Sequence, residues 1–383
     1  MNVRTVLVIG AGVAGSTAAY WLARNGFAVT VVERAAGERS SGSPVDVRGP
    51  AYCVAERMGV LPQLRAAATR ATRFSAVNGR GRRIGWVPMQ LGDGIEIPRS
   101  DLAAILADAG RDSAEYLYSD TVTSLIDDGN GVDVTFERAA PRRYDLVVGA
   151  DGLHSRVREL VFGTGFIHHM GLYVATVDLT AAVDDERTVL IYNAPGRAAA
   201  VHPATGRGIA AFVFRSPEFP GLDHRDAARQ REIVAAAYAG MGWRVPELLE
   251  RVRTADDMYF DSVSRVRLNR WSSGRIVLLG DAASCVSLFG EGSSLAIAGG
   301  ATLADAVAAH RDDPATALQY YERTHRKLVT PRQRWMGAGS RLIVPATAGG
   351  ILARDAIMRL WPVLSRAGAA SPGRDRGRAA HRG

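Results

Sequence analysis

Three glycines near the start of the chain, in the pattern GxGxxG, are the first residues whose spacing could do chemistry. They directly follow Thr5–Ile9, an apolar, β-branched segment typical of a strand buried on both faces. The first glycine permits a tight turn, the second lets backbone approach a pyrophosphate, and the third allows close helix–strand packing. The predicted phosphate-binding residues are Gly10, Gly12, Val13, Ala14 and Gly15.

A carboxylate, Glu33, follows the second apolar strand, Ala28–Val32. At this position a carboxylate can accept hydrogen bonds from both ribose hydroxyls of an adenosine, and it would repel a 2′-phosphate. Glu33 and the adjacent Arg34 are therefore predicted to contact a bound dinucleotide. These first residues leave open whether the dinucleotide is NAD or FAD.

Two later segments repeat the arrangement of a buried strand followed by a polar turn. In Asp145–Glu159 the apolar run ends at Asp151-Gly152, and in Arg275–Gly292 it ends at Gly280-Asp281. Arg99 stands before a helical pattern that starts at Asp101. An aspartate after a strand can accept a hydroxyl hydrogen bond, and a helix start favours negative charge on a ligand.

Taken in this order, the three motifs resemble those of FAD-dependent aromatic hydroxylases, the flavoprotein monooxygenases of the p-hydroxybenzoate hydroxylase type. The resemblance covers about residues 3–310. The segment Glu33–Arg48 is further similar to the branch that contains tetracycline-modifying monooxygenases. The resemblance implies FAD as cofactor. Beyond the glycine motif and Glu33-Arg34, it implies cofactor contacts from Arg39, Arg99, Asp151, Asp281, Gly290 and Gly292.

The resemblance also implies a reaction. NAD(P)H would dock transiently and reduce FAD, and O2 would then form a flavin C4a-hydroperoxide that hydroxylates or epoxidises a substrate. The expected substrate is a hydrophobic aromatic or polyketide-like small molecule, in secondary metabolism or antibiotic modification. No residue of the chain is predicted to act as a catalytic acid, base or nucleophile. An FAD-dependent dehydrogenase or double-bond reductase stays an alternative, as does a flavoprotein-like binding module without turnover.

The chain departs from the family pattern beside the Gly280-Asp281 motif. Ser284 stands where the family usually has histidine, and Ser287 and Leu288 replace two prolines. Glu291 replaces a usual glutamine. In the family these positions border the reactive face of the flavin, so we expect a loop with different charge and a different substrate pose.

Composition excludes several other classes. Lys plus Arg exceeds Asp plus Glu by 47 to 39, but Lys327 is the only lysine and no basic nucleic-acid stripe is predicted. Apolar runs fall short of a membrane helix, and the N-terminus lacks a secretory pattern, so a cytoplasmic protein is expected. Cys53 and Cys285 predict neither a disulfide nor a zinc site, and no metal spacing occurs. The oligomeric state stays open.

The surrounding elements predict the α/β class: a Rossmann-like, discontinuous FAD-binding domain with an inserted antiparallel-sheet substrate domain and a C-terminal helical segment. Arg143–Ala150 is expected to be one strand. Five aromatic side chains are candidates for lining a substrate cavity, although aromatics at strand spacing more often form ordinary core: Tyr192, Phe212, Phe214, Tyr259 and Phe260. The predicted boundaries are 1–170 and 267–345 for FAD, 171–266 for substrate, 346–370 for the helix and 371–383 for a disordered basic tail.

Overall fold

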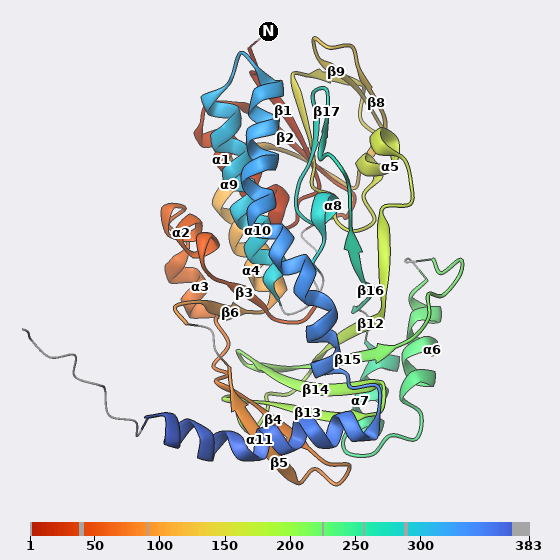
Figure 1. Cartoon of the computed structure of the whole chain (residues 1–383). Helices are drawn as coiled ribbons and strands as arrows, with labels where there is room; N and C mark the ends of the chain where they lie inside the picture. Colours follow the sequence, from red (N-terminus) through yellow and green to blue (C-terminus); the bar gives the residue numbers. More distant parts are fainter. Residues whose placement is uncertain are drawn as a thin grey trace, which may run out of the picture.

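A computed structural model describes residues 2–37, 42–89, 92–223, 226–255, 257–286 and 290–369. Arg39 and the predicted basic tail lie outside these ranges. The chain forms two main sheets, one above the other in Figure 1, with the long helix α10 (Pro314–Ile343) running from the first toward the second. The predicted α/β class is confirmed.

The first sheet has six strands in the order β17-β18-β11-β1-β2-β7. All neighbours pair in parallel except β17 and β18. Four of these strands, β1, β2, β11 and β18, are almost wholly buried, which explains their continuous apolar sequences. The strands are β1 (Thr5–Ile9), β2 (Ala28–Glu33), β7 (Glu115–Tyr118), β11 (Leu146–Gly149), β17 (Ser272–Ser273) and β18 (Ile276–Leu278).

Helices cover this sheet on the side of α1 (Figure 1). α1 packs against α4 and α9, and α9 packs against α10. By length and composition α9 could cross a membrane, but most of it is buried inside the protein, as in a core helix. The helices of this part are α1 (Val13–Arg24), α2 (Pro50–Arg57), α3 (Leu61–Ala67), α4 (Arg99–Gly110), η1 (Arg111–Ser113), α5 (Arg156–Phe162), α8 (Asp281–Ser284) and α9 (Glu291–Ala309).

Two small antiparallel sheets complete the part of the chain around the six-stranded sheet. One pairs β3 (Val45–Val47) with β6 (Ile95–Ile97), and β3 also packs against α9. The other has the order β10-β9-β8. Its strands are β8 (Val122–Asp127), β9 (Val132–Phe136) and β10 (Arg142–Tyr144).

The second sheet has seven strands in the order β16-β12-β15-β14-β13-β4-β5. Helices α6 (Ala227–Tyr238) and α7 (Val245–Thr254) cover one face and form an apolar core with it. The other face meets the end of α10 around Val344. The strands are β4 (Arg73–Val77), β5 (Arg83–Pro88), β12 (Ile167–Leu179), β13 (Thr188–Ala194), β14 (Arg197–Ala204), β15 (Arg207–Arg215) and β16 (Met258–Val266).

This sheet extends beyond the segment 171–266 that was expected to form it, because β4 and β5 come from much earlier in the chain. It is also not purely antiparallel, since β13 and β4 pair in parallel. The last helix, α11 (Ala348–Ala369), lies along β5, where Gly85 lets the backbone of Met358 approach: a Cβ there would lie 2.7 Å from its carbonyl carbon. The domain boundaries themselves stay a prediction.

The single strand expected over Arg143–Ala150 was wrong. The chain forms β10 and then β11, in different sheets, with Asp145 between them. The Asp145 carboxylate accepts hydrogen bonds from the backbone N–H groups of Arg4 and Thr5, both at 2.8 Å. The Asp145 side chain thus binds the start of β1 at the point where the chain passes from one sheet to the other.

Candidate functional site

The sequence motifs meet at the carboxyl edge of the six-stranded sheet. Gly10 follows β1, Asp151 follows β11 and Asp281 follows β18, and these three strands are neighbours. Backbone hydrogen bonds hold the strand ends level: Ala150 donates to the Ile9 carbonyl at 2.8 Å, and Leu279 donates to the Gly149 carbonyl at 2.9 Å. In open α/β sheets ligands bind outside this edge.

The glycine loop is shaped by close backbone contacts. Gly10 has φ +101°, and a Cβ there would lie 2.6 Å from the Ala150 carbonyl oxygen. A Cβ at Gly15 would lie 1.8 Å from the Gly10 carbonyl oxygen. A Cβ at Gly12, in contrast, would meet no atom within 4 Å. Gly10 and Gly15 are therefore required by packing, whereas Gly12 faces open space.

Gly12 is also the N-cap of α1, and no side chain caps this helix. Val13 and Ala14 are the first helical residues, both mostly buried. The helix therefore presents uncapped N–H groups and its positive dipole end to the open space at Gly12. A phosphate group fits this cradle, which a Cβ would fill.

Glu33 organises the same loop from the end of β2. Its carboxylate accepts hydrogen bonds from the backbone N–H groups of Ala11 (2.9 Å) and Ala35 (2.8 Å). Each oxygen keeps a further lone pair, so ribose hydroxyls remain possible donors. Arg34 is exposed beside it. Glu33 thus holds the loop and keeps lone pairs available to a ligand.

Asp151 lies in a hydrogen-bonded turn after β11. Its carboxylate accepts bonds from the Ser155 hydroxyl (2.5 Å) and the Val157 N–H (3.1 Å), while burial raises its pKa. Arg158 donates to the carbonyl oxygens of Leu153 (2.6 Å) and Ala282 (3.0 Å). Through Arg158 the turn is attached to α8, the helix that begins at Asp281.

Arg99 and Asp281 are close enough for their charges to interact, although α4 and α8 bring them from distant parts of the chain. Burial raises the pKa of Asp281, and the Arg99 charge opposes that shift. For Arg99 burial alone would lower the pKa, but Tyr259 and Asp281 outweigh it and the pKa rises. The Arg99 guanidinium carbon lies 6.0 Å from the centre of the Tyr259 ring, a cation–π arrangement. These groups could hold hydroxyl and carbonyl groups of a cofactor.

Gly290 and Gly292 lie at the start of α9. Gly290 is its N-cap with φ +71°, and its carbonyl accepts a bond from the Asp46 N–H at 3.3 Å. A Cβ at Gly292 would be 3.9 Å from the Asp281 carboxylate. Between them, Glu291 pairs with Arg48 at 2.6 Å and with Arg332 at 3.1 Å. Arg48 is thus bound to α9.

Four of the five aromatic candidates are ordinary core. Phe212, Phe214 and Phe260 pack within the cluster beneath α6 and α7, and Tyr192 packs at its edge. Successive strand residues point to opposite faces, so Tyr259 points away from Phe260 and toward Arg99. Tyr259 alone among these aromatics belongs to the face opposite the helices.

Two histidine–carboxylate pairs that the sequence did not reveal join the two parts. His202 of β14 lies 3.2 Å from Glu96 of β6, and both are buried. His154, from the turn after β11, lies 3.1 Å from Asp261 of β16. Their partners come from segments far apart in the chain, so no local pattern could have identified them.

A second buried carboxylate, Asp46, lies directly opposite Glu96 in the β3–β6 pair. Burial raises its pKa to about 6, against the effect of Arg48, and Glu96 adds to the rise. No group of three or more potential metal ligands occurs in the described parts of the chain. The groups that this site offers to a ligand are backbone N–H groups, arginine side chains and carboxylates.

Comparisons with known proteins agree with this geometry. The family model described as FAD binding domain matches residues 4–331. A flavin-dependent monooxygenase of Legionella longbeachae is 32% identical over 343 residues, covering 86% of this chain and 87% of that protein. The solved tetracycline destructase Tet(51) is 28% identical, with a TM-score of 0.83 and coverage of 97% and 100%. HpxO of Klebsiella pneumoniae, solved with FAD and uric acid, shares the fold at 21% identity and a TM-score of 0.74, with coverage of 95% of each chain.

Proposed function

Because this chain belongs to the FAD-binding-domain family of aromatic-hydroxylase-type, flavin-dependent monooxygenases, we propose that it uses NAD(P)H and O2 to oxygenate a hydrophobic small molecule. FAD is its cofactor. In the proposed reaction the substrate gains one oxygen atom of O2, the other leaves as water, and NAD(P)H and one proton supply the two electrons and two hydrogens. Bound FAD would supply the hydride-accepting and oxygen-activating chemistry.

The observation that carries the proposal is the convergence of the glycine loop, Asp151 and Asp281 beside Arg99. The N–H groups at the start of α1 would hold the pyrophosphate, and Glu33 the adenosine ribose. Asp281 would accept a ribityl hydroxyl, and the start of α9 would stabilise negative charge on the flavin ring. Arg39, outside the described residues, remains a proposed phosphate contact.

The substrate would lie between this site and the face of the seven-stranded sheet that carries Tyr259. That face combines apolar residues with a few polar groups, including the buried Thr176 of β12 and His202 of β14. A fixed apolar surface with sparse polar groups suits a flat aromatic molecule. The chain's similarity to a tetracycline destructase supports a polycyclic phenolic or polyketide-like substrate, as in antibiotic modification or secondary metabolism.

The chain's own residues would position the substrate and keep water away, since no acid–base dyad is needed. Arg158 and Ser155 hold the Asp151 turn closed, and the His154–Asp261 pair attaches this turn to the sheet. Holding the substrate and the cofactor in one relative orientation makes a bimolecular reaction effectively unimolecular. The sheet therefore acts as a roof whose position sets the reaction geometry.

The test begins with the absorbance spectrum of the purified protein, which should show bound FAD. Polycyclic phenols should accelerate NAD(P)H oxidation, and 18O2 should label the product with one oxygen atom. A product without the label, formed while NAD(P)H is consumed, would assign the protein to the flavin dehydrogenases or double-bond reductases instead. A flavin-loaded protein that oxidises no NAD(P)H with any substrate would leave it a binding module.

A further inference from the structure

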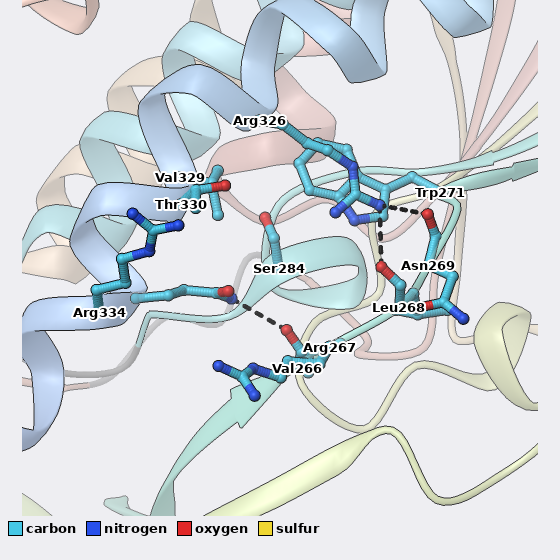
Figure 2. A pocket seen from close by; sticks show the side chains of 11 residues that line it. Val266, Arg267, Leu268, Asn269, Trp271, Ser284, Arg326, Val329, Thr330 and Arg334 are labelled. Carbon is cyan, nitrogen blue, oxygen red and sulfur yellow. Dashed lines mark hydrogen bonds between the residues drawn. The ribbon is translucent and has the colours of Figure 1, made fainter.

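A cavity outside the cofactor site lies between the end of β16, the short helix α8 and the middle of α10 (Figure 2). Its volume is about 300 Å³. The polar residues that line it include Arg267, Asn269, Ser284, Arg326, Gln333 and Arg334. No acidic residue is among the residues that line it. The cavity is therefore strongly basic.

Two of the lining side chains fix the walls. The Arg326 guanidinium stacks on Trp271, with 4.4 Å between guanidinium carbon and ring centre, and donates to the carbonyl oxygens of Leu268 and Asn269 (Figure 2). It also pairs with Glu322 at 2.7 Å. Gln333 donates to the Val266 carbonyl at 3.0 Å and ties α10 to the end of β16. The hydrogen-bonding capacity of these two residues is mostly used.

Arg267 and Arg334 differ from Arg326, because neither side chain has a carboxylate partner in the described part of the chain. They enter the cavity from different elements: Arg267 follows β16 and Arg334 belongs to α10 (Figure 2). The charge of Arg267 also acts on a neighbouring residue: burial, and then repulsion by Arg267, lowers the pKa of Arg265. Two free guanidinium groups on opposite elements leave this cavity with uncompensated positive charge.

The cavity shares one wall with the cofactor site. Ser284, which lines it, ends the helix that begins at Asp281. Gln333 also donates to the carbonyl of Cys285 at 3.3 Å. The segment from Asp281 to Cys285 thus separates the proposed flavin position from the basic cavity by one layer of chain.

We propose that this cavity binds the phosphate groups of the nicotinamide dinucleotide, a role that rests on the proposed function. Planar guanidinium groups bind phosphate oxygens in pairs, and Arg267 and Arg334 are free to do so. The Asn269, Ser284 and Thr330 side chains add neutral hydrogen-bonding groups. A volume of about 300 Å³ accommodates a diphosphate. The nicotinamide ring would then have to pass the edge of segment 281–285, because hydride transfer needs direct contact with the flavin ring.

The test uses the double variant Arg267→Ala/Arg334→Ala in the FAD-loaded, full-length protein. Each lost charged contact is expected to weaken phosphate binding about tenfold, so KM for NAD(P)H should rise about 10- to 100-fold. The rate of flavin reduction at saturating NAD(P)H should stay within about twofold, because both residues lie outside the cofactor site. Arg80→Ala/Arg82→Ala, at the exposed turn between β4 and β5, makes the same charge change and should leave KM unchanged.

Inorganic pyrophosphate separates this proposal from the proposed function. In the wild type it should bind, measured by calorimetry, and compete with NAD(P)H; in the double variant its binding should be lost. That binding can be measured even if the protein oxidises no NAD(P)H. Comparison of NADPH with NADH shows which phosphate the cavity binds. If it binds the 2′-phosphate, KM of the double variant should rise for NADPH only; if it binds the diphosphate, KM should rise for both. Wild-type KM in the double variant, or no pyrophosphate binding by the wild type, overturns the proposal.

Discussion

At the carboxyl edge of the six-stranded sheet, each proposed cofactor contact lies within a few residues of a strand end or at the start of a helix. The seven-stranded sheet has an outer face, covered by α6 and α7, and an inner face, which carries His202 and Tyr259. The inner face is built differently, from single residues contributed by separate strands. The first region depends on backbone shape, where glycine is required. The second depends on which face of a strand a side chain occupies, so its chemistry follows from pairing and register.

The largest expected effect concerns the outer face of the seven-stranded sheet. Phe212 is fully buried beneath α6 and α7. Phe212→Ala should lower the free energy of unfolding by about 4 kcal/mol, measured by urea denaturation, because it leaves a cavity in the core. Tyr259→Phe, on the inner face, should change stability little and alter flavin binding or turnover instead. If Phe212→Ala kept its stability and lost only turnover, Phe212 would belong to the substrate site.

The glycine loop should give the next largest effect. Gly15→Ala places a Cβ 1.8 Å from the Gly10 carbonyl oxygen, so the loop must move, and we expect a loss of about 3 kcal/mol in the apoprotein. Gly12→Ala is the matched control, because its Cβ meets open space. It should leave the apoprotein as stable as the wild type while weakening FAD binding. Equal destabilisation by both substitutions would contradict the assignment of Gly12 to a ligand cradle.

The junction between the two regions should show an unusual pH dependence. The pKa of Asp46 is 3.8 in the unfolded chain and about 6 in the folded protein. Between these values the folded protein keeps a proton that the unfolded chain has lost, so stability falls as pH rises. Asp46→Asn removes this loss. Its stability relative to the wild type should therefore rise by about 2 kcal/mol from pH 4 to pH 6.5 in chemical denaturation.

Asp185 provides a control of opposite sign, since hydrogen bonds from Thr188, Arg83 and others lower its pKa to about 2. The stabilisation by Asp185 is present above pH 3.8 and is lost as pH falls toward 2. Asp185→Asn should therefore lose stability relative to the wild type as pH rises from 2 to 4. A flat difference for Asp46→Asn between pH 4 and 6.5 would show that Asp46 is not desolvated in the folded protein.

The smallest of these effects should be seen at Asp281. Asp281→Asn keeps the shape of the side chain but removes the negative charge that faces Arg99. We expect FAD to bind about 30-fold more weakly in fluorescence titration of the apoprotein, since a charge-assisted hydrogen bond is lost. Asp101→Asn, in the first turn of α4, is a control on the same helix as Arg99. Unchanged FAD affinity in Asp281→Asn would remove Asp281 from the cofactor site.

Much of the nucleotide-binding region could be predicted because its motifs are local. A buried strand, a glycine or aspartate turn and a helix start lie within a dozen residues of one another, so their spacing alone indicates the chemistry. The strand expected over Arg143–Ala150 failed for a nonlocal reason. Its break depends on the contact of Asp145 with Arg4 and Thr5, which lie near the start of the chain.

Short motifs thus predicted a dinucleotide site and the parallel sheet, because phosphate binding needs glycines and helix starts at a set spacing. The choice of FAD came from the resemblance of the three motifs to those of aromatic hydroxylases. Only the tertiary structure decided that β4 and β5 join the seven-stranded sheet, that Tyr259 and not Phe212 faces Arg99, and that Glu96 meets His202. The same packing brought Arg267 and Arg334 to one cavity. The physical reason is that strand pairing, register and burial join residues far apart in the chain, and no local pattern of residue types records those contacts.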